Sequence, residues 1–164
     1  MSLPAVAEDG ERFGGDAGGS EAMIEFFVPY EVKPKGNSKK IVRMGRFTKL
    51  VEPPKSKANA AALTMLCAAH SPAKPLDGPV AASYRFQYAW RVQDTKRRAK
   101  GKLPTTVPKD TSPDLGNLVK QLDDVMEAGG FVANDAQIWM HSVSKVWADR
   151  PGVWVKLEAM GDVT

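Results

Sequence analysis

Carboxylates and one lysine gather between positions 113 and 137, at spacings that suit phosphodiester chemistry. Asp114 precedes a short amphipathic segment, Lys120 lies inside that segment, and Asp135 follows it after a pair of glycines. Carboxylate oxygens are the ligands that Mg²⁺ prefers, and a bound Mg²⁺ polarises a phosphodiester and activates water. A lysine beside such a site neutralises charge on the phosphate. These three residues are therefore the predicted catalytic residues.

The segment between the two outer carboxylates must allow them to meet. Residues 115–128 are expected to form a helix about 20 Å long, because apolar side chains recur on one face and a Gly-Gly pair ends it. The loop that follows lets the next strand return along the helix and bring Asp135 beside Asp114. We expect these two aspartates to bind Mg²⁺, with Asp124 of the helix as a further metal ligand.

Each of these residues also has a structural explanation that the sequence leaves open. An aspartate directly before a helix caps backbone N–H groups, which is the alternative role for Asp114. Lys120 and Asp124 are one helical turn apart, so they can form a surface ion pair of small energetic value. Asp135 stands where a turn residue often precedes a strand.

The rest of the chain predicts one α+β domain over residues 23–164, with a mixed β-sheet and two main helices. Strands are indicated by alternating apolar residues, and helices by apolar residues at helical spacing. The expected strands are 24–28, 80–90, 137–147 and 153–160, and the expected helices are 55–70 and 115–128. The last two strands are expected to form a C-terminal hairpin.

Three other segments have a distinct character. Residues 1–22 are rich in glycine and acids without periodicity, so we expect a disordered acidic tail. Residues 39–50 predict a basic hairpin that turns near Met44-Gly45. Residues 91–112 are polar and basic and contain proline, and they indicate a long mobile loop of the kind that is often functional.

Basic residues concentrate in two of these segments, ahead of an acidic C-terminal part. Residues 31–60 carry nine basic side chains against two acids, and residues 91–109 carry seven against one. This layout attracts a polyanion and can hold a cation beside it, although a scattered, solvated surface is the alternative. If both segments flank the acidic site, they contact DNA phosphates without reading bases. The predicted DNA-binding residues are Lys39, Lys40, Arg43, Arg46, Arg97, Arg98 and Lys100.

Composition excludes several classes of protein. No apolar run approaches the ~20 residues of a membrane span, and no basic-then-apolar signal peptide begins the chain. The single Cys67 cannot form an internal disulfide, which fits a reducing, cytoplasmic setting. It lies in an alanine-rich helical run, where we expect it to be a buried packing residue. One cysteine and two distant histidines do not make a zinc site.

The acidic stretch resembles the signature of RusA-type Holliday-junction resolvases. That signature is Pro-Asp-x-Asp-Asn-Leu-x-Lys, an Asp four residues after the Lys, then Gly, an aromatic residue, and Asp-Asp-x-Gln-Val. The residues that fall on it without a gap are Pro113, Asp114, Asn117, Leu118, Lys120, Asp124, Gly130, Phe131, Asp135, Ala136, Gln137 and Ile138. The order of the remaining elements also agrees, so the resemblance covers about residues 23–160.

This resemblance implies a homodimeric, Mg²⁺-dependent endonuclease that cuts four-way DNA junctions symmetrically during recombination and repair. It also implies a cytoplasmic protein, encoded by a bacterium or a phage. By the motif match, Asp114 and Asp135 would be metal-binding carboxylates, and Lys120 a catalytic or phosphate-contacting cation.

Two positions depart from the family pattern. Gly116 stands where the family usually has its second Asp, and Asn134 where the first Asp of the Asp-Asp pair is common. Asn134 keeps an oxygen ligand, whereas Gly116 removes a side chain, which should weaken Mg²⁺ binding and slow cleavage. Asp110, Asp123 or Asp124 could compensate. A cleavage-deficient branched-DNA-binding protein and a non-enzymatic basic nucleic-acid module are therefore alternatives to an endonuclease.

Overall fold

The computed structural model describes residues 22–33, 40–51 and 54–161. The expected acidic tail lies outside this part of the chain, apart from Ala22. The predicted DNA contact Lys39 also lies outside it, and only the backbone of Lys40 is described. Within the described ranges, no helix combines the length and the apolar character that crossing a membrane requires.

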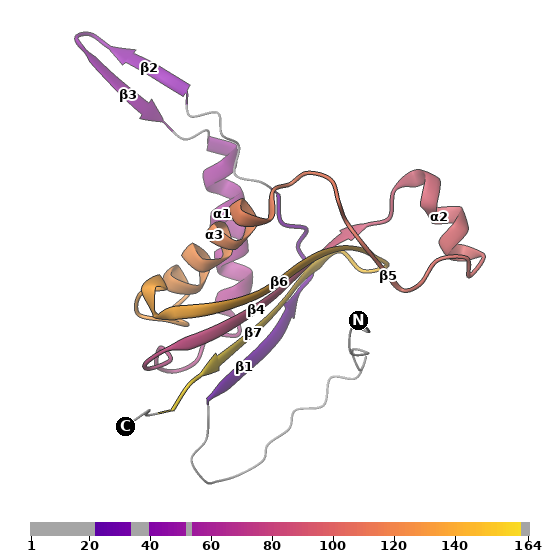
Figure 1. Cartoon of the computed structure of the whole chain (residues 1–164). Coiled ribbons are helices and arrows are strands. Elements are labelled where there is room, and N and C mark those ends of the chain that lie inside the picture. The colour runs from indigo at the N-terminus through magenta and orange to yellow at the C-terminus, as the bar shows by residue number, and fades with distance from the viewer. Residues whose placement is uncertain (1–21, 34–39, 52–53, 162–164) are drawn as a thin grey trace.

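A five-stranded mixed sheet forms the centre of the domain, in the order β1-β7-β4-β6-β5 (Figure 1). Its strands are β1 (Met23–Val28), β4 (Val80–Ala89), β5 (Thr106–Pro108), β6 (Ile138–Ala148) and β7 (Gly152–Ala159). β4 runs parallel to β6, whereas the other three neighbouring pairs are antiparallel. The α+β class and the mixed sheet expected from the sequence are therefore confirmed.

The last two strands are consecutive in sequence but not neighbours in the sheet, so the expected C-terminal hairpin is wrong. β4 lies between them and pairs with β6 on one edge and β7 on the other. Because β4 is buried along nearly its whole length, its backbone groups need strand partners on both sides. Gly152 then lets β7 begin close against β1, since a Cβ at this position would collide with Phe27 and the carbonyl oxygen of Val28.

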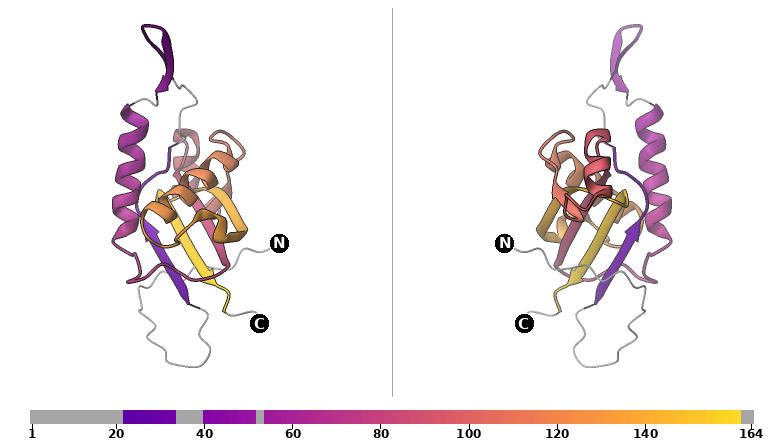
Figure 2. Two further views of the ribbon diagram at one scale, coloured as in Figure 1. Left: turned by 90° about the vertical axis from the view of Figure 1, so that its left-hand side faces the viewer. Right: turned by 90° about the vertical axis from the view of Figure 1, so that its right-hand side faces the viewer.

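The two main helices, α1 (Pro54–Ala68) and α3 (Leu115–Ala128), pack against each other over one face of the sheet (Figures 1 and 2). Their apolar side chains share one core with the inward-facing residues of β1, β4 and β7. The largest fully buried members are Tyr84, Phe86, Phe131, Leu63, Leu118, Leu122, Met126 and Leu157. Cys67 belongs to this core, as expected, and burial raises the pKa of its thiol to about 12.

The prediction of a long mobile loop over residues 91–112 is wrong, because this stretch contains α2 (Val92–Ala99) as well as β5. Ion pairs, and not an apolar face, hold α2 in place. The buried Asp94 pairs with arginines on either side of it in sequence, and Arg98 makes two hydrogen bonds to Asp149. Such contacts leave no hydrophobic period in the sequence, so the pattern gave no sign of a helix.

The basic hairpin that the sequence predicts is present as β2 (Lys40–Met44) and β3 (Phe47–Val51). Gly45 takes a φ of 60° in its turn, a conformation that favours glycine. Figure 2 shows the hairpin standing beyond the end of α1, away from the five-stranded sheet. In Figure 1 the hairpin and α2 extend to either side of the point where α3 begins.

Candidate active site

Asp114 caps α3 at its N-terminus. Its Oδ1 accepts hydrogen bonds from the backbone N–H groups of Gly116 and Asn117, at 2.7 and 3.3 Å. The capping role is therefore real, and a cap of this kind contributes about 1 kcal/mol to stability. The residue is exposed, and its Oδ2 accepts no hydrogen bond from the part of the chain that the structure describes. One carboxylate oxygen thus remains open to a cation or to water.

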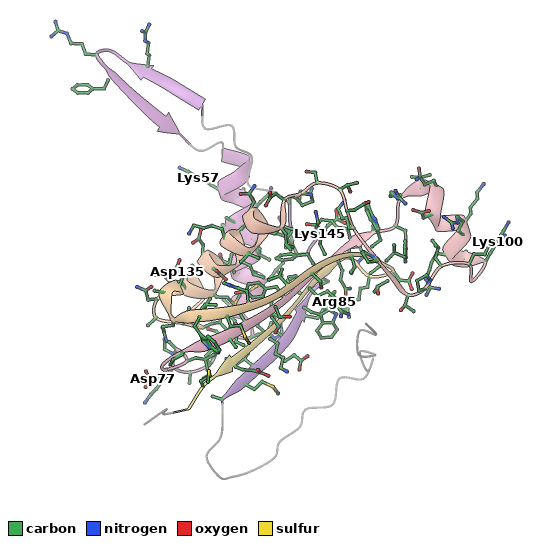
Figure 3. The ribbon with its side chains drawn as sticks, in the orientation of Figure 1. Lys57, Asp77, Arg85, Lys100, Asp135 and Lys145 are labelled. Atoms are coloured by element: carbon green, nitrogen blue, oxygen red, sulfur yellow. The ribbon has the colours of Figure 1, made fainter. Side chains whose placement is uncertain are left out.

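Lys145 of β6 fixes the backbone that leads into Asp114. Its Nζ donates hydrogen bonds to the carbonyl oxygens of Thr111 and Pro113, at 2.6 and 2.7 Å. Pro113 follows a cis peptide bond, and Figure 3 shows Lys145 close to this turn before α3. The place of Asp114 therefore depends on a distant lysine to which the sequence analysis gave no role.

Lys120 stands between two of the predicted acids. Its Nζ lies 3.2 Å from Asp124 Oδ1 and 3.9 Å from Asp135 Oδ2. The pKa of Lys120 is raised, first by the hydrogen bond to Asp124 and then by the charges of Asp124, Asp135 and Asp123. Its side chain is 72% exposed, so a charged ammonium faces solvent. The structure thus brings Lys120, Asp124 and Asp135 together.

A short 3₁₀ helix, η1 (Asp135–Gln137), presents Asp135 beside α3 (Figure 3). Asn134 caps η1, since its Oδ1 accepts a hydrogen bond from the N–H of Ala136 at 2.8 Å. Gln137 closes the turn, because its Oε1 accepts from the N–H of Asn134 and its Nε2 donates to two backbone carbonyls ahead of β4. Two residues of the motif therefore position Asp135, and the side-chain oxygen of Asn134 is engaged in the cap.

Asp114 and Asp124 belong to different parts of the site. They are ten residues apart along one continuous helix, which separates them by about 15 Å along the axis. One ion cannot bind both, because Mg²⁺ holds its oxygen ligands at about 2 Å. Among the described residues, no three His, Cys, Asp or Glu side chains form a group that could hold a metal. In this arrangement the residues present do not fit the three-carboxylate site that the motif resemblance implies.

Gly116 lies where a neighbouring ligand to Asp114 would begin. A Cβ placed on Gly116 would lie 3.2 Å from Asp114 Oδ1. A side chain at this position would therefore stand directly against the Asp114 carboxylate. Its absence leaves that carboxylate with backbone N–H groups as its only hydrogen-bond partners among the described residues.

A second polar cluster, which the sequence analysis did not find, lies on the inner side of α3. The hydroxyl of Tyr84 donates to Asp123 Oδ1 at 2.8 Å, and His141 Nε2 lies 3.0 Å from both oxygens of Asp123. Burial, and then the charge of Asp123, raise the pKa of Tyr84. Both oxygens of Asp123 are thus engaged within the protein, so this residue is poorly suited to replace a missing metal ligand. Three separate elements supply the cluster, and no local spacing signals it.

The predicted DNA contacts differ in how far they are already paired. Arg97 and Arg98 each form an ion pair with an aspartate, at 3.4 and 2.8 Å. Arg43 and Arg46 are exposed near the tip of the β2–β3 hairpin, and Lys100 is exposed just after α2. Among the described residues no ion pair involves the hairpin arginines or Lys100, so for the predicted DNA contacts they face less competition than the two arginines inside α2.

Fold and site together define a class of protein: an α+β domain that carries acids and a lysine on one helix, with a basic element on either side (Figure 1). A comparison with protein families then identifies the class more closely. The model of the family described as Endodeoxyribonuclease RusA matches residues 29–158, well over half of the chain. The protein therefore belongs to the RusA endodeoxyribonuclease family, and the resemblance in its motif is confirmed. The comparison with curated proteins gives no match.

Proposed function

We propose that this protein is an endonuclease that cuts four-way DNA junctions, and that Gly116 slows its cleavage. The observation that carries the proposal is the meeting of Lys120 from α3 with Asp135 from η1, at 3.9 Å. Lys120 belongs to the first part of the family motif and Asp135 to its last part, and their contact supports one site built from both parts. Lys120 would place its exposed ammonium at a phosphate oxygen and stabilise negative charge that develops during cleavage.

Mg²⁺ is the cofactor that we propose for cleavage, with Asp114 and Asp135 as the ligands that the family resemblance implies. The approach of these two carboxylates to one ion stays a prediction. Two carboxylates hold a hard cation less strongly than three, because each adds charge and a coordinating oxygen. The geometry at Gly116 supports weaker metal binding, since a side chain at this position would begin beside the Asp114 carboxylate and glycine supplies none. We therefore expect cleavage that needs a high Mg²⁺ concentration.

We propose that the active form is a homodimer, since symmetric cutting of a junction requires two active sites. The outer edge of β6 supports this proposal. β5 pairs with its last three residues and Lys109 donates a hydrogen bond to the carbonyl oxygen of Lys145, so within the described chain the edge from Ile138 to Ser144 has no strand partner on that side. Trp139 and Met140 on this strand are 56% and 45% exposed. An unpaired edge with exposed apolar side chains is a surface that a second copy can cover.

The second candidate function is a branched-DNA-binding protein without cleavage. The glycine at position 116 favours it, together with the pairing of Lys120 by Asp124 and Asp135. The two functions share their substrate and differ only in the chemical step. Both therefore require that the protein distinguish a junction from ordinary duplex DNA.

The test compares a synthetic four-way junction with a linear duplex of the same sequence. Binding is measured in EDTA, and cleavage is measured in Mg²⁺ or Mn²⁺. The endonuclease proposal expects selective junction binding and slow, paired cuts at symmetric positions. Junction binding without cleavage, together with cleavage gained by Gly116→Asp, would establish the second function. Equal binding to both DNAs without cleavage would refute both functions.

A further inference from the structure

A cavity of about 340 Å³ opens directly before Asp114. Its lining includes Pro113, which precedes Asp114, together with Lys109 and the aromatic rings of Tyr88 and Trp147. The volume is in the range of pockets that hold small ligands or parts of larger ones. None of the catalytic or DNA-binding residues predicted from the sequence lines this cavity, so a ligand bound in it would contact residues outside the predicted site.

Lys109 is the unusual residue of this cavity, because it is a lysine that is only 8% exposed. Its Nζ donates a hydrogen bond to Thr111 Oγ1 at 2.6 Å and lies 3.9 Å from the centre of the Trp147 ring. Within the described chain no carboxylate forms an ion pair with it. Burying an ammonium against neutral partners is unfavourable. An anion that entered the cavity would offset this cost.

The charges around the cavity favour an anion. Burial lowers the pKa of Lys109, and the nearby positive charges of Lys145 and Arg91 lower it further, whereas Glu31 and Asp110 oppose these effects. Lys33 and Glu31 both line the cavity. Bases thus outnumber acids around the ammonium, so an entering anion meets a positive potential.

We infer that this cavity binds one phosphate of the DNA backbone, next to the nucleotide held at Asp114, and that Lys109 contacts it. The inference rests on the proposed function, because it assigns part of the same DNA to this surface. The ammonium occupies the face of Trp147, so that face is closed to a stacked base, and a phosphate is the ligand that fits. An ammonium has three N–H donors and Thr111 takes one, which leaves others for phosphate oxygens.

The experiment measures binding of a four-way junction in EDTA over a series of salt concentrations. The slope of log K against log salt becomes shallower by about 0.9 for each phosphate contact that is lost. Lys109→Met keeps the apolar stem against Trp147 and removes the charge, so we expect a slope shallower by about this amount. Lys74→Met is the matched control. It makes the same charge change at an exposed residue before β4, at the other end of the sheet, and should leave the slope unchanged.

The outcomes separate this inference from the proposed function. A wild-type protein that binds no junction refutes the function. A wild-type protein that binds, with an unchanged slope in Lys109→Met, overturns only the phosphate site. Lys109→Gln, which is neutral but can still bond to Thr111, must give the same slope as Lys109→Met. If both variants melt far below the wild type, the ammonium supports the fold itself, and the inference is wrong.

A second measurement locates the phosphate. Neutral methylphosphonates replace single phosphates near the cut site, one at a time. One position should weaken binding to the wild type and have no effect on Lys109→Met, because the contact is already absent there. If the methylphosphonate at every position changes binding to the wild type and to Lys109→Met equally, Lys109 contacts no phosphate.

Discussion

Replacing Gly116 by aspartate should give α3 a second carboxylate at its N-terminus and strengthen Mg²⁺ binding there. The new Cβ would lie 3.2 Å from Asp114 Oδ1, so Asp114 must shift slightly to accept it. Two carboxylates about 4 Å apart repel by about 1 kcal/mol in water, and the helix N-terminus offsets about 0.3–1 kcal/mol of this. Because the site is exposed, we expect the metal-free variant to lose no more than about 1 kcal/mol of stability.

Mg²⁺ should reverse this loss in the variant. A metal present at a hundred times its dissociation constant stabilises the folded state by about 2.7 kcal/mol. At this chain length each kcal/mol raises the melting temperature by about 2–4 °C, so a rise of about 5–10 °C is expected. Thermal melting during a Mg²⁺ titration measures it, and junction cleavage should increase in parallel.

Gly116→Asn is the matched control for that experiment, because it has nearly the same shape without the charge. It should show no larger response to Mg²⁺ than the wild type. If the Asp and Asn variants respond equally, or if neither cuts faster than the wild type, position 116 does not belong to a metal site.

Asp114→Ala should lower the free energy of unfolding by about 1 kcal/mol through the lost cap, whereas Asp114→Asn keeps a good capping residue and its stability; urea unfolding measures both, and equal losses would contradict the cap. Lys145→Met removes two hydrogen bonds from a charged donor, so we expect the free energy of unfolding to fall by about 2 kcal/mol or more and junction cleavage to slow. An unchanged melting temperature would contradict this role. Trp139→Glu should convert the proposed dimer to monomers in sedimentation, and a variant that stays dimeric would exclude this strand edge as the interface. Burial raises the pKa of Cys67 to about 12, so its thiol should resist iodoacetamide at pH 8 until urea unfolds the protein; rapid labelling of the native protein would contradict its burial.

The sequence predicted the main elements because each carries its own local pattern. The strongly alternating β4 and the amphipathic α3 were found with bounds close to those observed. α2 was missed, since its stability comes from Asp94 and Arg98, whose partners are charges and not an apolar face. Local patterns could not predict the order of the strands either, because β4 comes from a distant part of the chain and lies between β6 and β7 in the sheet.

The candidate site also contains residues that the sequence predicted and contacts that it could not predict. The return of the chain after α3 predicted that Asp135 lies beside Asp114, and this approach stays a prediction. The contact that the structure shows for Asp135 is with Lys120, one of the three predicted catalytic residues. The supports of the site could not be foreseen. Lys145 of β6 bonds to the turn before Asp114, and His141 of the same strand contacts Asp123 of α3. These contacts depend on tertiary packing, which spacing along the sequence does not record.

The rate at which wild type and Asp114→Asn cut a synthetic four-way junction at saturating Mg²⁺ tests the endonuclease proposal most directly. Asp114→Asn keeps the helix cap and removes the carboxylate charge, so a change in rate reports on chemistry and not on folding. We expect slow, paired cuts by the wild type and a rate at least about tenfold lower in the variant, which corresponds to about 1.4 kcal/mol of activation free energy. Efficient cleavage that is equally fast in both proteins would contradict the role of Asp114 and the proposed site.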